Sequence, residues 1–255
     1  MKASAMEFRL RFWILCGIYL LGFMAPWNWA LHLDGAGPNA HVWGRLAVAL
    51  SRGGTMGLMT AFNVVLVAGT VLAFAGAALR TWGSAYLGVD VMRDESLRSD
   101  AVVAEGPYRR MRNPLYVGLW LHTLALALLM PVSGAVFAVV AVVLFQLRLM
   151  LAEEAFLTQK LGAAYVAYCQ QVPRIVPALR PKAGDAGLRP RWGHAVLAEI
   201  YLWGVAGCFA TLGWKYNAAL LIRGVLISLG VSLVLRGVVA EPGKKMLKTE
   251  ESDKA

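Results

Sequence analysis

The sequence predicts an all-α, polytopic membrane protein with about six membrane-spanning helices and a polar pocket at their cytoplasmic ends. Three observations predict this fold class. The mean hydropathy is +0.57. Only 16% of the residues are charged, whereas a soluble domain carries about 25%. Several uncharged runs reach the ~20 residues that cross a bilayer.

The predicted spans follow the uncharged runs of the chain: residues 12–31, 53–79, a pair folded from 113–147, 194–214 and 218–239. The run 113–147 is too long for one crossing, and the turn Met130-Pro131-Val132-Ser133-Gly134 folds it into a tight helical hairpin of spans three and four. Between spans one and two, Trp43, Leu46 and Leu50 recur at helical spacing. This spacing predicts a short helix in the membrane interface.

The distribution of basic residues predicts the orientation. With the N-terminus inside, the inner segments hold 21 Lys and Arg residues and the outer segments hold four. This asymmetry predicts an integral multi-pass protein of the cell inner or plasma membrane with both termini in the cytoplasm. The N-terminal apolar run is as long as a span, which favours a first transmembrane helix over a removed signal peptide.

A linker is predicted at residues 182–191, which contain two glycines and a proline. It separates a four-span core, residues 1–181, from a two-span C-terminal extension with a cytoplasmic tail, residues 192–255. Within the extension, Glu199 and Arg236 are expected at similar depth on antiparallel helices. A structural ion pair between them is the preferred interpretation.

Several function classes are excluded or disfavoured. The net charge of +10 does not indicate nucleic-acid binding, because Lys and Arg gather at the ends of apolar runs, where membrane topology places them. The three cysteines and four histidines show no ligand spacing, so no metal site is predicted. His122, midway along span three, is interpreted as the donor or acceptor of one interhelical hydrogen bond.

Two polar clusters remain: EGPYRRMRNPLYVG at residues 105–118 and QLRLMLAEEAFLTQKLGAAYVAYCQQVPRIVP at residues 146–177. The second cluster is predicted to continue span four into the cytoplasm as one helix that ends at Val172-Pro173. By themselves the residues leave two interpretations open. The arginines of the first cluster are typical topology anchors, and Glu153 with Glu154 is compatible with ordinary surface charge on an amphipathic helix. The Asn-Pro-x-Tyr helix start, four residues after a Gly-Pro-Tyr turn, is not explained by anchoring.

Together the two clusters resemble the isoprenylcysteine carboxyl methyltransferase and phospholipid methyltransferase family of integral membrane enzymes. The resemblance covers residues 80–177. It is carried by the order G-P-Y, R-N-P-x-Y-x-G, hairpin, E-E, L-G-x-x-Y-x-x-Y and V-P-R. It implies an S-adenosylmethionine-dependent methyltransferase that binds its cofactor at the cytoplasmic face and acts on a lipophilic or membrane-embedded acceptor.

The resemblance also implies site residues. The cofactor-lining positions of the family correspond here to Asp100, Ala101, Val102, Val103, Tyr108, Asn113, Pro114, Leu115, Tyr116 and Glu153. The Glu153 carboxylate suits the cofactor's ammonium or ribose. Free N–H groups at the start of span three suit its carboxylate, and Tyr108, Tyr165 or Tyr168 suits its adenine.

Two catalytic roles are predicted beside the cofactor. Arg148 is expected to orient an anionic group of the acceptor, and Glu154 to position the acceptor or act as a base. The isoprenylcysteine enzymes have His at the position of Asn113 and Arg at the position of Leu149. These departures leave the acceptor open among carboxylates, amines and thiols, and the sequence does not define the oligomeric state. Two alternative functions are a membrane reductase that uses NADPH and a non-catalytic protein that binds a lipid or a partner.

Overall fold

The computed structural model describes residues 2–24, 41–54, 56–87, 104–183 and 187–252, with the backbone alone for residues 236 and 238–252. Every regular element in these ranges is helical. The elements are α1 (Ala5–Met24), α3 (Val42–Arg52), α4 (Leu58–Tyr86), η1 (Gly106–Arg109), α6 (Pro114–Ala127), α7 (Val132–Leu161), α8 (Ala163–Gln171), α9 (Trp192–Ala198), α10 (Ile200–Leu212), η2 (Gly213–Lys215) and α11 (Ala218–Ser252). The all-α prediction is confirmed for this part of the chain.

Three helices are long and apolar enough to cross a membrane: α4, α7 and the segment Ala218–Leu235 of α11. A fourth span is obtained when α9 and α10, which meet at an angle of 69°, are counted as one broken span. Helix α6 has only 14 residues, about 21 Å at 1.5 Å per residue, which is shorter than the ~30 Å hydrocarbon layer. The structure therefore supports three to four of the predicted spans by length and composition. Of predicted span one, α1 includes residues 12–24, and residues 25–31 lie outside the described ranges.

The predicted hairpin is confirmed as α6 and α7, whose turn occupies residues 128–131. The backbone N–H groups of Leu128, Leu129 and Met130 each donate to the carbonyl three residues earlier, which tightens the end of α6. Pro131 precedes the first residue of α7, where its missing N–H costs no helical hydrogen bond. The predicted short helix between spans one and two is α3, whose Trp43 is buried.

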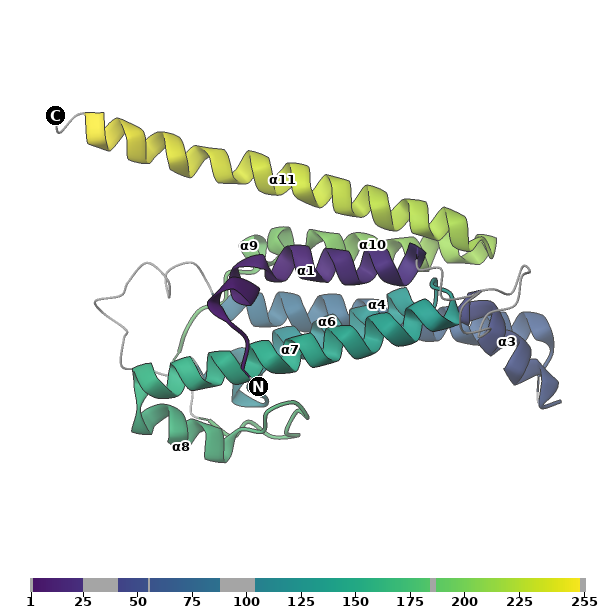
Figure 1. Cartoon of the computed structure of the whole chain (residues 1–255), viewed down its shortest axis with the longest axis horizontal. Helices are drawn as coiled ribbons and strands as arrows, with labels where there is room; N and C mark the ends of the chain where they lie inside the picture. The colour runs from purple at the N-terminus through teal and green to yellow at the C-terminus, as the bar shows by residue number, and fades with distance from the viewer. Residues whose placement is uncertain (1, 25–40, 55, 88–103, 184–186, 253–255) are drawn as a thin grey trace.

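Two predicted continuous helices are broken in the structure. The second cluster does not form one helix, because Gly162 takes φ +56° and separates α7 from α8. Predicted span five is also interrupted, at Glu199, where α9 ends and α10 begins. Both breaks lie at the charged end of the bundle, and in Figure 1 α8 returns alongside the C-terminal part of α7.

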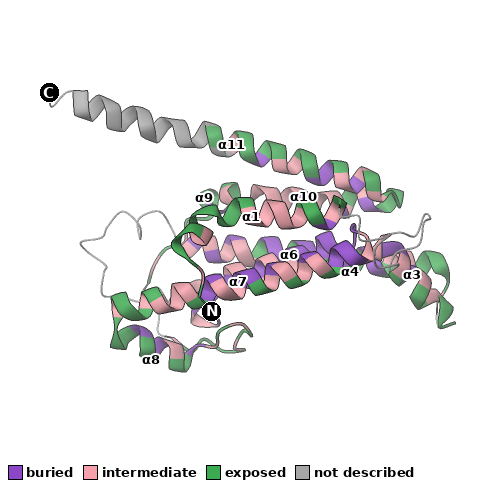
Figure 2. Ribbon diagram, viewed as in Figure 1, coloured by how far each residue is buried: buried purple, intermediate pink, exposed green. Residues whose placement is uncertain are grey.

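The main hydrophobic core lies toward the opposite end, near α3 and the hairpin turn. It contains the buried side chains of Leu66, Leu126, Leu129, Met130 and Phe209. Figure 2 shows buried residues concentrated on α4 and α6 and exposed residues on the outer helices. Because α4 packs against both α6 and α10, the C-terminal extension is joined to the first four spans through α4. The domain boundary at residues 182–191 stays a prediction.

Glu199 is paired with Arg80 on α4, and the side chain of Arg236, its predicted partner, lies outside the described part of the chain. Its carboxylate accepts Arg80 Nε at 2.7 Å and Arg80 Nη2 at 3.0 Å. Ser84 Oγ adds a third donor at 2.8 Å. Glu199 lies at the break between α9 and α10, where its carboxylate faces α4, and the predicted pairing with Arg236 stays a prediction.

Candidate functional site

The two sequence clusters meet at one end of the bundle. The N–H of Arg112 donates to the carbonyl of Pro173 at 2.9 Å, and the N–H of Ala178 donates to the carbonyl of Arg110 at 2.9 Å. The chain that follows α8 therefore runs along the loop between η1 and α6. These backbone bonds join residues about 60 positions apart in the sequence, so the V-P-R segment completes the site begun by G-P-Y.

Local backbone chemistry fixes the first cluster. Gly106 takes φ +54°, a conformation that side chains disfavour. A Cβ there would lie 2.3 Å from the ring of Tyr86, so glycine is also required for the close approach of η1 to α4. Pro114 is the first residue of α6, and Asn113 precedes it without capping the helix by its side chain. Asn113 instead donates from Nδ2 to the carbonyl of Arg174 at 3.2 Å.

Glu154 is held between two arginines. Its Oε1 accepts Arg112 Nη1 at 3.0 Å and Arg174 Nε at 3.0 Å, and its Oε2 accepts Arg174 Nη2 at 2.8 Å. The hydrogen bond to Glu154 raises the pKa of Arg174 above its ordinary value. Arg112 also donates from Nη1 to the sulfur of Cys169 at 3.2 Å, while its buried Nε has no hydrogen-bond partner. The arrangement cross-links α7, α8 and the start of α6, and the predicted catalytic role of Glu154 stays a prediction.

Glu153, the neighbouring carboxylate, faces a different group. Its Oε2 accepts the hydroxyl of Tyr116 at 3.1 Å, which joins α7 to the first turn of α6. Within the described ranges Oε1 of Glu153 has no hydrogen-bond partner, in contrast to both oxygens of Glu154. The two adjacent glutamates thus differ in what they can still bind. One is fully engaged by arginines, and the other retains an acceptor oxygen.

Three tyrosines predicted near the cofactor lie together. Tyr108, Tyr165 and Tyr168 are all buried. Tyr168 donates its hydroxyl to the carbonyl of Tyr108 at 2.8 Å, and the rings of Tyr165 and Tyr168 lie 5.8 Å apart between centroids. The hydroxyl of Tyr108 is buried and has no hydrogen-bond partner among the residues that the structure describes. Burial raises the pKa of Tyr108 well above its ordinary value, so this hydroxyl is protonated at neutral pH and can donate a hydrogen bond.

Arg148 is directed toward α1. Its Nη2 donates to both carboxylate oxygens of Glu7, at 2.9 and 3.0 Å. This pair ties α1 to α7 at the charged end of the bundle, and the predicted contact of Arg148 with an acceptor stays a prediction. Asp100, Ala101, Val102 and Val103 lie outside the described residues.

The sequence did not single out Arg112 and Arg174 as site residues, although both occur in the recognised motifs. In the sequence Arg112 has the same appearance as the neighbouring anchors Arg109 and Arg110. Only the contact with Glu154 distinguishes it. Their motif context, R-N-P and V-P-R, was the signal that could have identified them.

The fold and the site together define a helical membrane protein with a carboxylate-containing polar site at the charged end of a helical hairpin. Residues 44–164 match the model of the phospholipid methyltransferase family. Over 78 residues the chain is 41% identical to protein-S-isoprenylcysteine O-methyltransferase B of Arabidopsis thaliana. That alignment covers 30% of this chain and 39% of the plant protein. No solved structure matches the chain.

These matches confirm the family resemblance predicted from the two clusters. The region that matches the family model extends from α3 to the start of α8, so it contains the hairpin, η1, Glu153 and Glu154. It begins earlier than the predicted boundary at Arg80 and ends before the V-P-R segment. The C-terminal helices α9, α10 and α11 lie beyond it.

Proposed function

We propose that this protein transfers a methyl group from S-adenosylmethionine to a lipophilic or membrane-embedded acceptor. The observation that carries the proposal is the contact between Glu153 and Tyr116, at the charged end of the α6–α7 hairpin and within the region that matches the family model. The Glu153 oxygen that has no partner within the described ranges is suited to the cofactor's ammonium group or ribose hydroxyls.

The other groups of the site fit the same cofactor. Because Asn113 does not cap α6, the N–H groups of Leu115 and Tyr116 at the helix start are available to a carboxylate. The buried hydroxyl of Tyr108 adds a donor that has no partner in the described part of the chain. S-adenosylmethionine supplies a methyl group already activated by a sulfonium. The protein's part is therefore to align donor and acceptor and to exclude water.

The Glu154–Arg112–Arg174 cluster supports this role by fixing the backbone around the site. It holds the end of α7 against the start of α6, so Glu153 and Tyr116 keep their mutual position. A carboxylate acceptor would need no general base. A protonated amine or thiol would need one, and Glu154 serves that role only after release from its arginines.

The membrane setting explains why this chemistry lies at the end of the bundle. Helix α7 has 30 residues, about 45 Å at 1.5 Å per residue, so it extends past a ~30 Å hydrocarbon layer. The distribution of basic residues supports a site that lies, with both termini, on the cytoplasmic side of an inner or plasma membrane. A soluble donor then reaches the site from water while a lipid acceptor arrives from the bilayer.

The proposal is tested by calorimetry of the purified full-length protein with S-adenosylmethionine. We expect binding in the natural protein and at least tenfold weaker binding, about 1.4 kcal/mol, in Glu153→Gln. Lys160→Gln, which removes an exposed charge farther along α7, is the matched control. Absence of binding in the natural protein, or equal binding in the two variants, overturns the proposal. Thermal stabilisation by NADPH and not by S-adenosylmethionine overturns it in favour of a reductase.

The acceptor is identified in a second experiment. The protein is incubated with radiolabelled S-adenosylmethionine and a total membrane extract, and the labelled product is analysed by mass. We expect label in the lipid-soluble fraction, and label confined to water-soluble products contradicts a lipophilic acceptor.

A further inference from the structure

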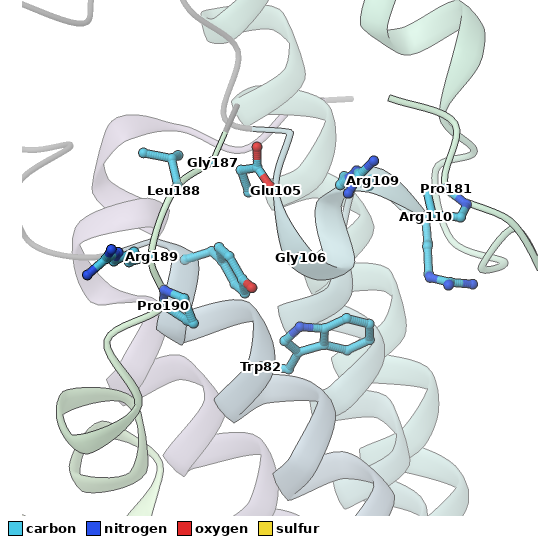
Figure 3. Close-up of a pocket in the computed structure, with 11 residues that line it drawn as sticks. Trp82, Glu105, Gly106, Arg109, Arg110, Pro181, Gly187, Leu188, Arg189 and Pro190 are labelled. Carbon is cyan, nitrogen blue, oxygen red and sulfur yellow. The ribbon is translucent and has the colours of Figure 1, made fainter. Parts of the chain in front are cut away.

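A pocket of about 360 Å³ lies at the charged end of the bundle, between the C-terminal end of α4, η1 and the segment 187–190. Its lining includes three arginines: Arg109 at the end of η1, Arg110 directly after it, and Arg189 before α9 (Figure 3). Among the described residues that line it, Glu105 is the one acidic residue. Arg110 donates to the neutral carbonyls of Ala178 and Leu179, and it forms no ion pair with a residue in the described ranges. The lining is therefore basic and suited to an anion.

A second cavity adjoins it on the side of the bundle. It has a volume of about 560 Å³ and its walls are almost entirely apolar. Its lining comes from α4, α9 and α10, chiefly Ala78, Leu79, Trp192, Val196 and Trp203. Two of these, Trp192 and Val196, are exposed, so the cavity is an open groove along the outside of the helices.

The bend between α9 and α10, and the contacts of these helices with α4, determine the shape of the groove. Helix α9 leaves the direction of α10 by 69°. The bend is fixed where Arg80 binds Glu199. Trp203 donates from Nε1 to Thr81 Oγ1 at 2.9 Å, which holds α10 against α4 below the bend. The small side chain of Ala78 leaves the space between the helices unfilled.

Trp82 lines both cavities. The basic pocket and the apolar groove therefore lie next to each other at this residue, within reach of the head and the chain of one amphiphile. The groove residues of α4 begin at Ala75, seven residues before Trp82, which corresponds to about 10 Å along the helix. Both volumes lie in the ~300–1,000 Å³ range of small-molecule sites.

We propose that the pocket and the groove together bind an anionic amphiphile, with its head group at Arg110 and Arg189 and its hydrocarbon chain between α4 and α9. The occupant follows from charge and polarity, because a basic pocket selects an anionic head and an apolar groove excludes a polar chain. Two sources have this chemistry: the methyl acceptor and an anionic lipid that remains bound. Binding of the anionic amphiphile does not depend on the proposed function. Its identification as the methyl acceptor does rest on the proposed function.

The site is tested by tryptophan fluorescence of the full-length protein in detergent, titrated with dibrominated stearate at about pH 9, where the carboxylic acid is ionised. Bromine quenches indole fluorescence on contact, and Trp82, Trp192 and Trp203 line the groove. We expect saturable quenching. The methyl ester of the same chain should bind more weakly because it lacks the anionic head.

Two matched pairs of variants test the two halves of the site. Ala78→Phe fills the groove and should weaken binding by about tenfold. Val64→Phe, at an exposed position of α4 outside the groove, should leave binding unchanged. Arg189→Gln should weaken binding about threefold, as expected for an exposed charge. Arg180→Gln, an exposed arginine that does not line the pocket, is its control.

Equal affinities within either pair of variants, or equal affinities for acid and ester, overturn the proposal. Calorimetry with S-adenosylmethionine on Ala78→Phe separates this failure from failure of the proposed function, because cofactor binding should persist in that variant. Transfer of label from S-adenosylmethionine to the bound stearate supports the acceptor as occupant. Binding without transfer supports a resident anionic lipid.

Discussion

The ion pair between Arg80 and Glu199 offers a direct test of how the C-terminal helices are held. We consider Arg80→Met, which keeps most of the side-chain length and removes the charge. The change leaves the Glu199 carboxylate with Ser84 as its one remaining donor of the three in the structure. Arg80 also donates from Nη1 to the carbonyl of Leu115 at 3.2 Å, and that bond is lost as well.

The expected magnitude follows from burial. The side chain of Glu199 is 5% exposed and that of Arg80 is 22% exposed, so both charges are largely removed from water. Removal of one partner of a buried pair costs about 3–5 kcal/mol, because the other charge stays buried without compensation. At about 2–4 °C per kcal/mol for a chain near this size, Tm should fall by about 6–20 °C.

The measurement is thermal unfolding of the purified protein in detergent, followed by tryptophan fluorescence. The double variant Arg80→Met with Glu199→Met should recover most of the loss, because no charge then remains buried. Arg148→Met is the control, since Arg148 and Glu7 are 34% and 29% exposed. A partly exposed pair contributes about 0–1 kcal/mol, so its Tm should fall by no more than ~4 °C. Equal losses for Arg80→Met and Arg148→Met, or no recovery in the double variant, would refute the reasoning.

Two further substitutions probe the site. Gly106→Ala adds backbone strain and a clash with the ring of Tyr86 at 2.3 Å, so we expect a loss of roughly 2–4 kcal/mol in thermal unfolding. Gly162→Ala is its control, because it also has a positive φ but has open space around it, so it should cost only the backbone strain, about 1–3 kcal/mol, without the clash. Tyr116→Phe removes the donor to Glu153. A hydrogen bond to a charged group contributes about 1.5–3 kcal/mol, so calorimetry should show S-adenosylmethionine binding at least tenfold weaker. Unchanged affinity contradicts a role for this contact.

Much of the architecture could be predicted from local patterns. Long uncharged runs identified α4, α7 and α11, because the bilayer requires apolar length and continuous backbone hydrogen bonding. Pro131 marked the hairpin, because proline interrupts a helix at a defined position. The breaks at Gly162 and Glu199 were missed. Each lies inside a pattern that continues on both sides, and neither residue type breaks a helix by itself.

The candidate site, like the fold, could be predicted only in part from the sequence. The ordered motifs identified Tyr116, Glu153 and Glu154, and the comparisons support the family to which those motifs belong. The motifs did not show which glutamate is engaged. Adjacent residues on a helix point about 100° apart, so Glu153 and Glu154 reach different neighbours. Those neighbours, Tyr116 on one side and Arg112 on the other, are set by how α6 crosses α7.

By itself the sequence determined the helical membrane class, the hairpin and the family-typical residues of the charged end. Apolar length, proline and short motifs act locally, so they can be read along the chain. Only the tertiary structure decided that Glu199 binds Arg80, that Glu154 is held by two arginines, and that Trp82 joins a basic pocket to an apolar groove. Ion pairs and cavities depend on the distance between helices far apart in the chain, and side-chain packing alone sets that distance.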